Sequence, residues 1–95
     1  MVEQGDILKV EGIKHQVVVI SKNSINKLGR VTVCPLIHPD VIPALSVMID
    51  DGVYVACDTI KQLDLEERRY SVRGHISILK LISIIDRVQS MIDYY

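Results

Sequence analysis

The stretch KHQVVVISKNSIN, residues 14–26, places four β-branched apolar residues between two polar ends. The run from Val17 to Ile20 has no polar position, so it does not alternate between a core side and a solvent side. Such a run predicts a strand, Gln16 to Ser21, that is buried on both faces. Its polar ends are interpreted in two ways: they cap the strand, or they carry reactive groups to the mouth of a site.

Short strands are predicted on both sides of this one, and most of them end at glycine or aspartate turns. They are Asp6 to Val10, Arg30 to Leu36, Ala44 to Ile49, Val53 to Cys57 and Tyr70 to Ile76, and Asp50, Asp51 and Gly52 form a hairpin turn. The segment Asp58 to Arg69 is charged and is expected to be less regular. Pro35 cannot donate a ladder hydrogen bond, so the third strand is expected to leave the sheet, or to lie at its edge, near Ile37 and His38.

The C-terminal part of the chain predicts a helix that begins after Ser77. Ser77 is a suitable N-cap, and Ile76 and Leu81 have the spacing of a hydrophobic staple. One apolar stripe at helical spacing contains Ile78, Leu81, Ile82, Ile85, Val88 and Ile92. Leu79, Ile84 and Met91 widen it beyond the arc of about 100° that a surface helix needs. The excess is buried either in the chain's own core or against a partner.

These elements predict a mainly β fold with a C-terminal helix. A small twisted antiparallel sheet of five or six strands, curled into a partly open barrel with the helix packed on it, buries all of the apolar faces. The 95 residues fit one domain over residues 1–95,. One modest core leaves little room for a large binding surface, so self-association is expected.

Composition limits the classes of protein that remain. The chain is 48% apolar but has no Trp or Phe and only four Tyr, so its core must consist of Val, Ile and Leu. No window reaches the roughly 18 apolar residues of a membrane span, and residues 1–5 lack the parts of a signal peptide, so a soluble cytoplasmic protein is expected. Cys34 and Cys57 lie in apolar runs and are expected to be buried free thiols. The cysteines and histidines lack zinc spacing, so neither a metal nor another cofactor is expected.

The charge distribution is uneven along the chain. A net charge of −1 argues against a protein that coats nucleic acid. However, no acidic residue lies between Glu11 and Asp40, where the cations are Lys14, Lys22, Lys27 and Arg30. This basic surface either attracts phosphate or is an ordinary solvated face.

Five segments occur in the order and spacing of the MazF/PemK-like toxins of bacterial toxin–antitoxin systems. They are GDILKV at residues 5–10, VVVIS at 17–21 followed by Asn26, VTVCPL at 31–36, CDTIKQLD at 57–64 and GHIS at 74–77. The resemblance covers nearly the whole chain. It implies a homodimer of small barrel-like subunits, with a cognate antitoxin whose flexible acidic tail lies across the RNA-binding groove.

The resemblance also implies a ribosome-independent endoribonuclease that cuts single-stranded messenger RNA without a metal. In this chemistry the 2′-hydroxyl attacks the neighbouring phosphate, which leaves a cyclic phosphate and a free 5′-hydroxyl. It requires a proton acceptor, a proton donor and groups that stabilise phosphoryl charge. It also requires RNA, because DNA lacks the nucleophile.

The chain departs from the family pattern at positions important for cleavage. His15 and Gln16 stand where the family has an arginine followed by a proline, and a shift of one residue would instead offer Lys14. Ile37 replaces a Thr or Ser, and His38 follows it. The glycine-rich loop of the family is reduced to residues 11–13.

We therefore expect His15 to act as acid or base, Lys14 to hold phosphate charge and His38 to be the second proton-transfer group, since histidine titrates near neutral pH. The expected RNA-binding residues are Lys22, Asn26, Arg30 and Lys61. Each has a structural alternative: Asn26 caps a turn, and the cations lie on a solvated surface. Arg68, Arg69 and Arg73 are expected to form salt bridges with Glu66 and Glu67, or to bind phosphate, and His75 is expected to be structural.

Two alternatives to an active nuclease remain open. A chain that has lost these catalytic residues would be a noncatalytic binding module, and the related CcdB-like toxins poison DNA gyrase with the same fold. The ending MIDYY, residues 91–95, lacks the Trp and Gly of a gyrase poison and counts against that role. Only Tyr54 and Tyr70 are aromatic away from the C-terminus, which leaves few platforms for base stacking and weakens the nuclease interpretation.

Overall fold

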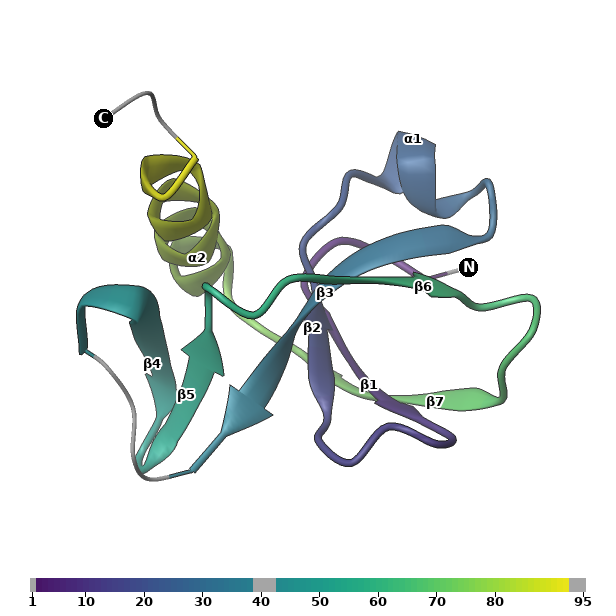
Figure 1. The fold of residues 1–95 in the computed structure, drawn as a ribbon, viewed down its shortest axis with the longest axis horizontal. Helices are drawn as coiled ribbons and strands as arrows, with labels where there is room; N and C mark the ends of the chain where they lie inside the picture. The colour runs from purple at the N-terminus through teal and green to yellow at the C-terminus, as the bar shows by residue number, and fades with distance from the viewer. Residues whose placement is uncertain (1, 39–42, 93–95) are drawn as a thin grey trace.

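The computed structural model describes residues 2–38 and 43–92, which form seven antiparallel strands, two α-helices and one 3-10 turn (Figure 1). In chain order these are β1 (Asp6–Val10), β2 (Val17–Val19), α1 (Asn23–Asn26), β3 (Arg30–Ile37), the turn Pro43–Leu45, β4 (Ser46–Asp50), β5 (Val53–Ala56), β6 (Lys61–Asp64), β7 (Tyr70–His75) and α2 (Ile78–Ser90). The strand order is β4-β5-β3-β2-β1-β7, and β6 pairs with β3. The predicted fold class, mainly β with a C-terminal helix, is confirmed.

The long strand β3 connects two groups of strands (Figure 1). One of its edges pairs with β2, and its other edge pairs first with β6, at residues 30–33, and then with β5, at Leu36 and Ile37. Of the two alternatives predicted from Pro35, the strand leaves the sheet where expected, because β3 ends at Ile37. The other alternative, that β3 is an edge strand, is wrong, because β3 has neighbours on both sides. Pro35 instead lies where the outer partner of β3 changes from β6 to β5.

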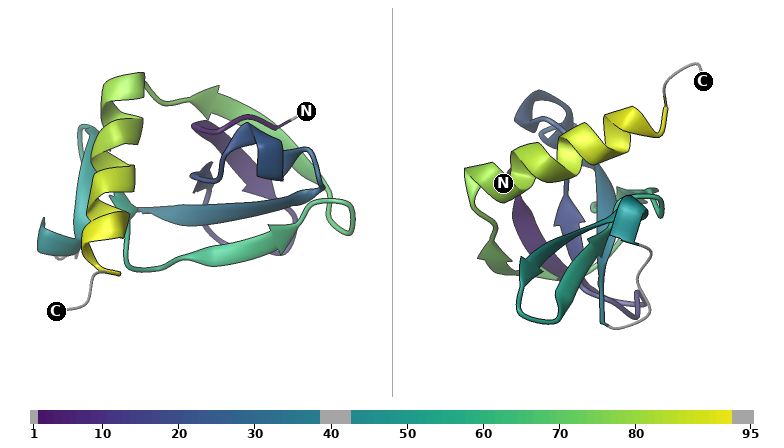
Figure 2. Two further views of the ribbon diagram at one scale, coloured as in Figure 1. Left: turned by 90° about the horizontal axis from the view of Figure 1, so that it is seen from above. Right: turned by 90° about the vertical axis from the view of Figure 1, so that its left-hand side faces the viewer.

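Strand β2 lies between two apolar cores, as its sequence predicts. Val17 and Val19 face one core, with Leu8, Val10 and residues of β3 and β6. Val18 and Ile20 face the other core, which is closed by α2. All four side chains are at most 8% exposed. Figure 2 shows α2 lying across the end of the molecule that contains β4 and β5.

Helix α2 begins as predicted but buries a different stripe. The Ser77 Oγ accepts a hydrogen bond from the Lys80 N–H at 3.3 Å. The buried positions are Leu81, Ile84 and Val88. Ile78, Leu79, Ile82 and Ile92 remain exposed, so the chain's own core covers only part of the apolar arc. No helix in residues 2–38 and 43–92 is long and apolar enough to span a membrane.

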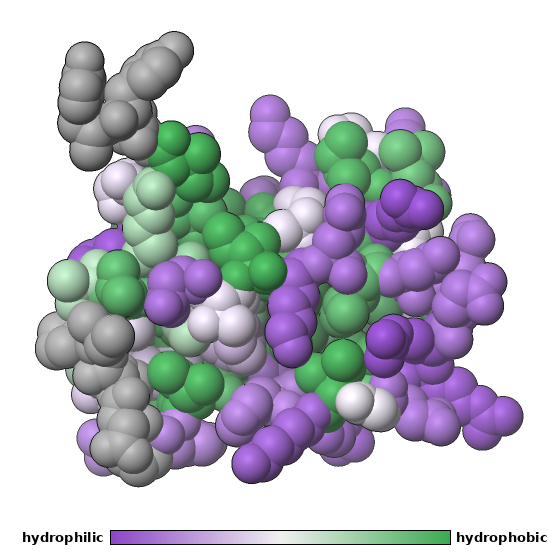
Figure 3. All heavy atoms as spheres, in the orientation of Figure 1, coloured by the Kyte–Doolittle hydropathy of each residue, from purple (hydrophilic) through white to green (hydrophobic). Residues whose placement is uncertain are grey.

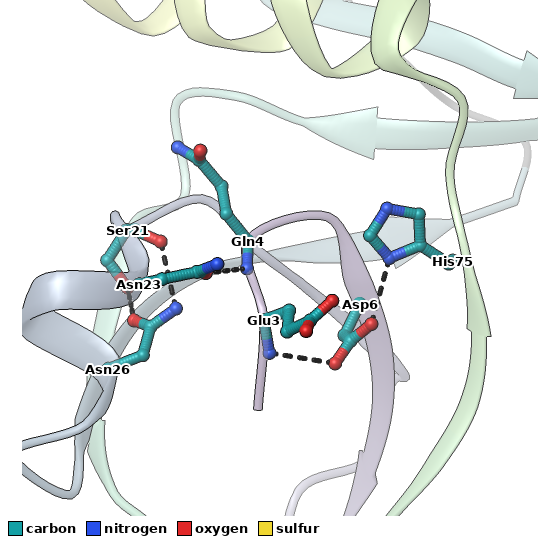
Figure 4. Close-up of polar contacts among 7 residues, drawn as sticks. All are labelled: Glu3, Gln4, Asp6, Ser21, Asn23, Asn26 and His75. Atoms are coloured by element: carbon teal, nitrogen blue, oxygen red, sulfur yellow. Dashed lines mark hydrogen bonds and ion pairs between the residues drawn. The ribbon is translucent and has the colours of Figure 1, made fainter. Parts of the chain in front are cut away.

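A polar network holds both ends of the stretch that follows β2 (Figure 4). The Ser21 Oγ donates to the Asn26 Oδ1 and accepts from the Thr32 N–H at 3.0 Å. The Asn26 Nδ2 donates to the Ser21 carbonyl at 3.0 Å. The Asn23 Oδ1 accepts from the Gln4 N–H at 2.7 Å, which ties the N-terminal segment to α1.

A second polar contact joins the first strand to the last. The Asp6 carboxylate is 2.9 Å from the His75 Nδ1, and its other oxygen accepts from the Glu3 N–H. Gly5 has a φ of +94°, and a Cβ there would lie 2.9 Å from the His75 ring. His75 therefore has the structural role that the sequence predicted, at the junction of β7 and α2.

The sequence did not predict β6 or α1. β6 has only one buried residue, Leu63, in a hydrophilic four-residue segment, so periodicity gives no signal there,. It forms because its backbone pairs with β3. α1 is a single turn whose Asn26 is held by side-chain bonds, and such short segments have little helical propensity of their own.

Both cysteines are free and fully buried, as predicted. Burial raises the pKa of the Cys34 thiol to about 12, and the neighbouring Cys57 and Asp58 add to the rise. Burial likewise raises the pKa of the Cys57 thiol to about 11, although Arg87 opposes this shift. Both groups are therefore protonated apolar side chains at neutral pH.

Replacing Asn26 with Ala should lower the free energy of unfolding by about 1–3 kcal/mol, because the Ser21 hydroxyl and carbonyl groups both lose their bonds to the buried Asn26 side chain,. The exposed neighbour substitution Ser24→Ala should change it by less than about 0.5 kcal/mol,. Urea unfolding measures both values. Equal stability of the two variants would contradict a structural role for Asn26.

The raised thiol pKa values predict a loss of stability in alkali. Above about pH 9, the ordinary value, the unfolded chain releases thiol protons that the folded chain retains. The free energy of unfolding should then fall by up to about 1.4 kcal/mol per pH unit for each thiol, until the pH reaches the folded pKa values. Urea unfolding of the wild type and of the Cys34→Ala, Cys57→Ala double variant, from neutral pH to about pH 10, measures the difference. The same alkaline slope in both proteins would refute the prediction.

Candidate active site

A mismatch between strands creates an opening beside β3. Val33 pairs with Lys61 of β6, and Leu36 pairs with Val55 of β5. The two β3 residues between these pairs therefore lie opposite the five residues 56–60. The extra residues leave the sheet there, and Pro35 has no N–H that would need a partner on that side.

This opening is a pocket of about 310 Å³. Its apolar lining residues are Pro35, Ile37, Leu45 and Ala56, and its polar lining residues are His15, Ser46, Asp58 and Thr59. The Cys57 N–H donates to the Leu45 carbonyl at 2.9 Å, and the Thr59 N–H donates to the Ala56 carbonyl at 3.2 Å. The first bond ties the segment that carries Asp58 to the end of the 3-10 turn before β4, and the second makes a local turn within the segment.

His15 reaches the pocket because pairing continues beyond the end of β2. Val17 pairs with Pro35, and the Leu36 N–H donates to the Gln16 carbonyl at 2.8 Å. This places His15 beside Ile37, whose side chain also lines the pocket. Positions 15 and 37, two of the positions at which the sequence is expected to depart from the family pattern, therefore meet in one pocket.

The other two predicted catalytic residues do not line this pocket. Lys14 is exposed, and its carbonyl accepts from the Lys9 Nζ at 3.2 Å. His38 is exposed and its Nδ1 lies 3.2 Å from the Gly52 carbonyl, at the turn between β4 and β5. Lys14 is next to the pocket in the chain, whereas His38 is directed to the hairpin.

The predicted RNA-binding residues are spread along β3. Arg30 begins β3, five residues before Pro35, which is roughly 16 Å along an extended strand,. Lys22 and Asn26 lie at the two ends of α1, which contacts β3, and Asn26 is only 5% exposed within the network described above. Lys61 begins β6 and is exposed, two residues after Thr59. Of the four, Lys61 is the nearest to the pocket along the chain.

The sequence interpretation did not single out Asp58, Thr59 and Ser46. Asp58 and Thr59 lie within the CDTIKQLD motif, in which Lys61 is the residue predicted to bind RNA. What identifies them is the difference between the register of β6 and that of β5 along the outer edge of β3, and this difference is known only from the structure. Ser46 is only 8% exposed and lies within the predicted strand Ala44 to Ile49, so the sequence offered no reason to place it in a site.

The pocket combines an imidazole, a carboxylate and two hydroxyl groups against an apolar wall. Imidazole and carboxylate groups transfer protons, and hydroxyl groups donate hydrogen bonds to anionic oxygens. This set is suited to acid–base chemistry on an ester of an oxyacid. Among the described residues, no group of three or more His, Cys, Asp or Glu is placed to hold a metal ion.

Solved structures with this fold include toxins and their complexes. The chain is similar to a MazE–MazF crystal structure from Deinococcus radiodurans, with a TM-score of 0.85, 17% identity, and 95% of this chain and 94% of that chain covered. It is also similar to an endoribonuclease in complex with its cognate antitoxin from a mycobacterial species, with a TM-score of 0.83, 15% identity and full coverage of both chains. At these identities the likeness establishes the fold.

No curated protein matches the chain in a sequence search. A family model described as "PemK-like, MazF-like toxin of type II toxin-antitoxin system" matches residues 3–92. This match spans every strand of the described sheet and all buried core residues except Val2. The chain therefore belongs to the PemK-like, MazF-like toxins of type II toxin–antitoxin systems.

Proposed function

We propose that this toxin is a ribosome-independent endoribonuclease that cuts single-stranded messenger RNA, with the 2′-hydroxyl as nucleophile and without a metal ion. The observation that carries the proposal is the pocket beside β3, which brings His15 and Asp58 together in a member of this family. The antitoxin-bound mycobacterial relative is named as an endoribonuclease, which is consistent with this activity.

The proposed reaction requires two proton transfers. The 2′-hydroxyl gives its proton to a base, and its oxygen forms a bond to the adjacent phosphorus. The bond from phosphorus to the 5′-oxygen breaks, and that oxygen takes a proton from an acid. The products are a 2′,3′-cyclic phosphate and a 5′-hydroxyl, so protons and bonds balance without a redox partner.

We assign the two proton-transfer roles to His15 and Asp58. Both line the pocket, and each side chain is a group that enzymes use for this purpose,. The prediction from sequence gave the second role to His38, but the His38 ring lies by the Gly52 carbonyl and does not line the pocket. Thr59 lines the pocket and Lys14 precedes His15 in the chain, so we assign the binding of the phosphoryl oxygens to these two residues,.

Replacing His15 with Ala should reduce the rate of RNA cleavage by about 100-fold or more, the usual contribution of an acid or base. The measurement is cleavage of a mixed-sequence single-stranded RNA, with a chelator present and cyclic-phosphate ends detected. Gln16→Ala is the matched control, because the Gln16 contact with Leu36 uses only its backbone. Near-full activity of the His15 variant would reject the proposal.

The same assay separates Asp58 from His38 as the second group. Asp58→Asn should lose activity to a similar extent as His15→Ala, whereas His38→Ala should stay within a few-fold of the wild type. The reverse result would return the role to His38. If RNA stays intact and cleaved plasmid is trapped in a gyrase assay, the gyrase alternative is favoured. If neither RNA nor plasmid is cleaved, the chain is a binding module.

The proposed working form is a homodimer in the bacterial cytoplasm, each subunit being one domain over residues 1–95. Support comes from the exposed apolar side chains Ile78, Leu79 and Ile82 on α2, since monomeric proteins rarely expose such a contiguous patch,. Figure 3 shows apolar side chains gathered over α2, whereas the surface around β6 is largely hydrophilic. We further propose that a cognate antitoxin inhibits the dimer by laying an acidic tail across the RNA-binding groove.

The double substitution Leu79→Glu, Ile82→Glu should convert the dimer to a monomer, because charges are costly in an apolar interface. Light scattering coupled to size-exclusion chromatography measures the mass. Ile25→Glu and Leu28→Glu, at exposed apolar positions on and after α1, are matched controls that should leave the dimer intact. A wild-type chain that is monomeric at all accessible concentrations would refute the dimer.

A further inference from the structure

The last strand, β7, has an unpaired edge. It stands at the end of the strand order, and in the described part of the chain its only neighbouring strand is β1. Five of its six residues are exposed. Figure 1 shows it at the margin of the sheet, next to β1. An unpaired edge is a template for another strand unless it is blocked.

The backbone of β7 directs two residues toward this open edge. The Glu11 N–H donates to the Arg69 carbonyl at 2.9 Å, so residue 69 faces β1. In an antiparallel pair, bonded and non-bonded residues alternate. The N–H and carbonyl groups of Tyr70 and Val72 therefore point away from β1, where they are available to an added strand.

The side chains on one face of β7 extend an existing core. Tyr70 and Val72 lie opposite Val10 and Leu8, which are fully buried. Yet Tyr70 is 41% exposed and Val72 is 53% exposed. A strand added beside β7, with apolar side chains at alternate positions, would cover this margin.

The other face of β7 is cationic. Ser71 lies opposite Lys9, and the Arg73 Nε donates to the Ser71 Oγ at 3.0 Å, so Arg73 shares that face. Arg69 occupies the alternate position before Ser71. The expected salt bridges of Arg68, Arg69 and Arg73 with Glu66 and Glu67 are absent: within residues 2–38 and 43–92, the ion pair observed is Asp6 with His75. The Arg68 Nη1 instead donates to the Glu11 carbonyl.

We propose that the open edge of β7 binds an extended acidic peptide as an added antiparallel strand, with apolar residues beside Tyr70 and Val72 and carboxylates beside Arg69 and Arg73. The charge of the edge selects this occupant. A second copy of β7 would bring the arginines of two chains together, and like charges across a strand pair are destabilising. This binding is independent of the nuclease reaction, because the edge lies outside the pocket that contains His15.

The test uses an eight-residue acetylated peptide of alternating valine and glutamate, titrated into the full chain by calorimetry. The wild type should bind it, and a peptide with lysine in place of glutamate should bind at least tenfold more weakly. Hydrogen exchange of the Tyr70 and Val72 amides should slow when the acidic peptide is bound. Failure of the wild type to bind, or equal binding of both peptides, would overturn the proposal.

Two variants test the two parts of the recognition. Val72→Pro removes an outward donor while leaving the pairing with β1, and Arg73→Glu reverses the charge; each should raise the dissociation constant at least tenfold. Lys80→Glu, the same charge change on α2, should have no effect. Circular dichroism checks each fold, and Arg73→Glu remains a test if the proline variant is unfolded. Wild-type affinity in a folded Arg73→Glu variant would overturn the role of charge.

The remaining outcomes separate other occupants and the proposed reaction. If wild-type chains associate with one another and Val72→Pro abolishes that association, the occupant of the edge is a second copy of the chain. If RNA displaces the peptide and its binding also requires Arg73, the occupant is RNA. Either result overturns the proposal. His15→Ala should bind the peptide with wild-type affinity. Peptide binding without RNA cleavage would therefore refute only the proposed nuclease activity. RNA cleavage without peptide binding would refute only the proposed binding of a peptide to β7.

Discussion

The burial of β2 between two cores is the constraint on which the rest of the structure depends. Its run of Val17, Val18, Val19 and Ile20 supplies both cores, and burial of four such side chains contributes roughly 6–12 kcal/mol,. That amount is comparable to the whole net stability of a small domain, about 5–15 kcal/mol. Because both faces are apolar, however, a slip by one residue would still bury apolar groups on each side. Burial therefore holds the strand in place but discriminates weakly among its registers.

The register of β2 is set instead by its polar ends. At one end the Ser21 Oγ binds the Thr32 N–H and Asn26, and at the other the Leu36 N–H binds the Gln16 carbonyl. A slip would break these hydrogen bonds, and a polar group left without a partner away from water costs about 1–3 kcal/mol. The same register places His15 beside Ile37, so the geometry of the pocket depends on bonds made near the far end of the strand. Ser21, Asn26 and Thr32 thereby help to position His15, to which we assign a proton-transfer role.

Much of the fold follows from local patterns, and much of the site does not. Three features could be predicted from residues adjacent in the sequence: the apolar run of β2, the Ser77 cap and the hairpin turn at Gly52. β6 is formed by pairing with β3, and only Leu63 marks it in the sequence. The buried stripe of α2 centres on Ile84, because contact with β4 selects one side of an arc that is apolar over most of its width. Asp58 enters the pocket through a difference in register between two strands, which no single segment encodes.

That difference in register also explains how the fold tolerates change at the site. The residues that carry Asp58 leave the sheet opposite Pro35, where β3 offers no N–H, so no β3 donor loses a partner there,. His15 is exposed and Ile37 is half-buried at the mouth of the pocket, and neither belongs to the two buried cores. Substitutions at such positions change the side chains that line the pocket with little cost in core packing. The scaffold and the pocket lining are therefore under separate constraints.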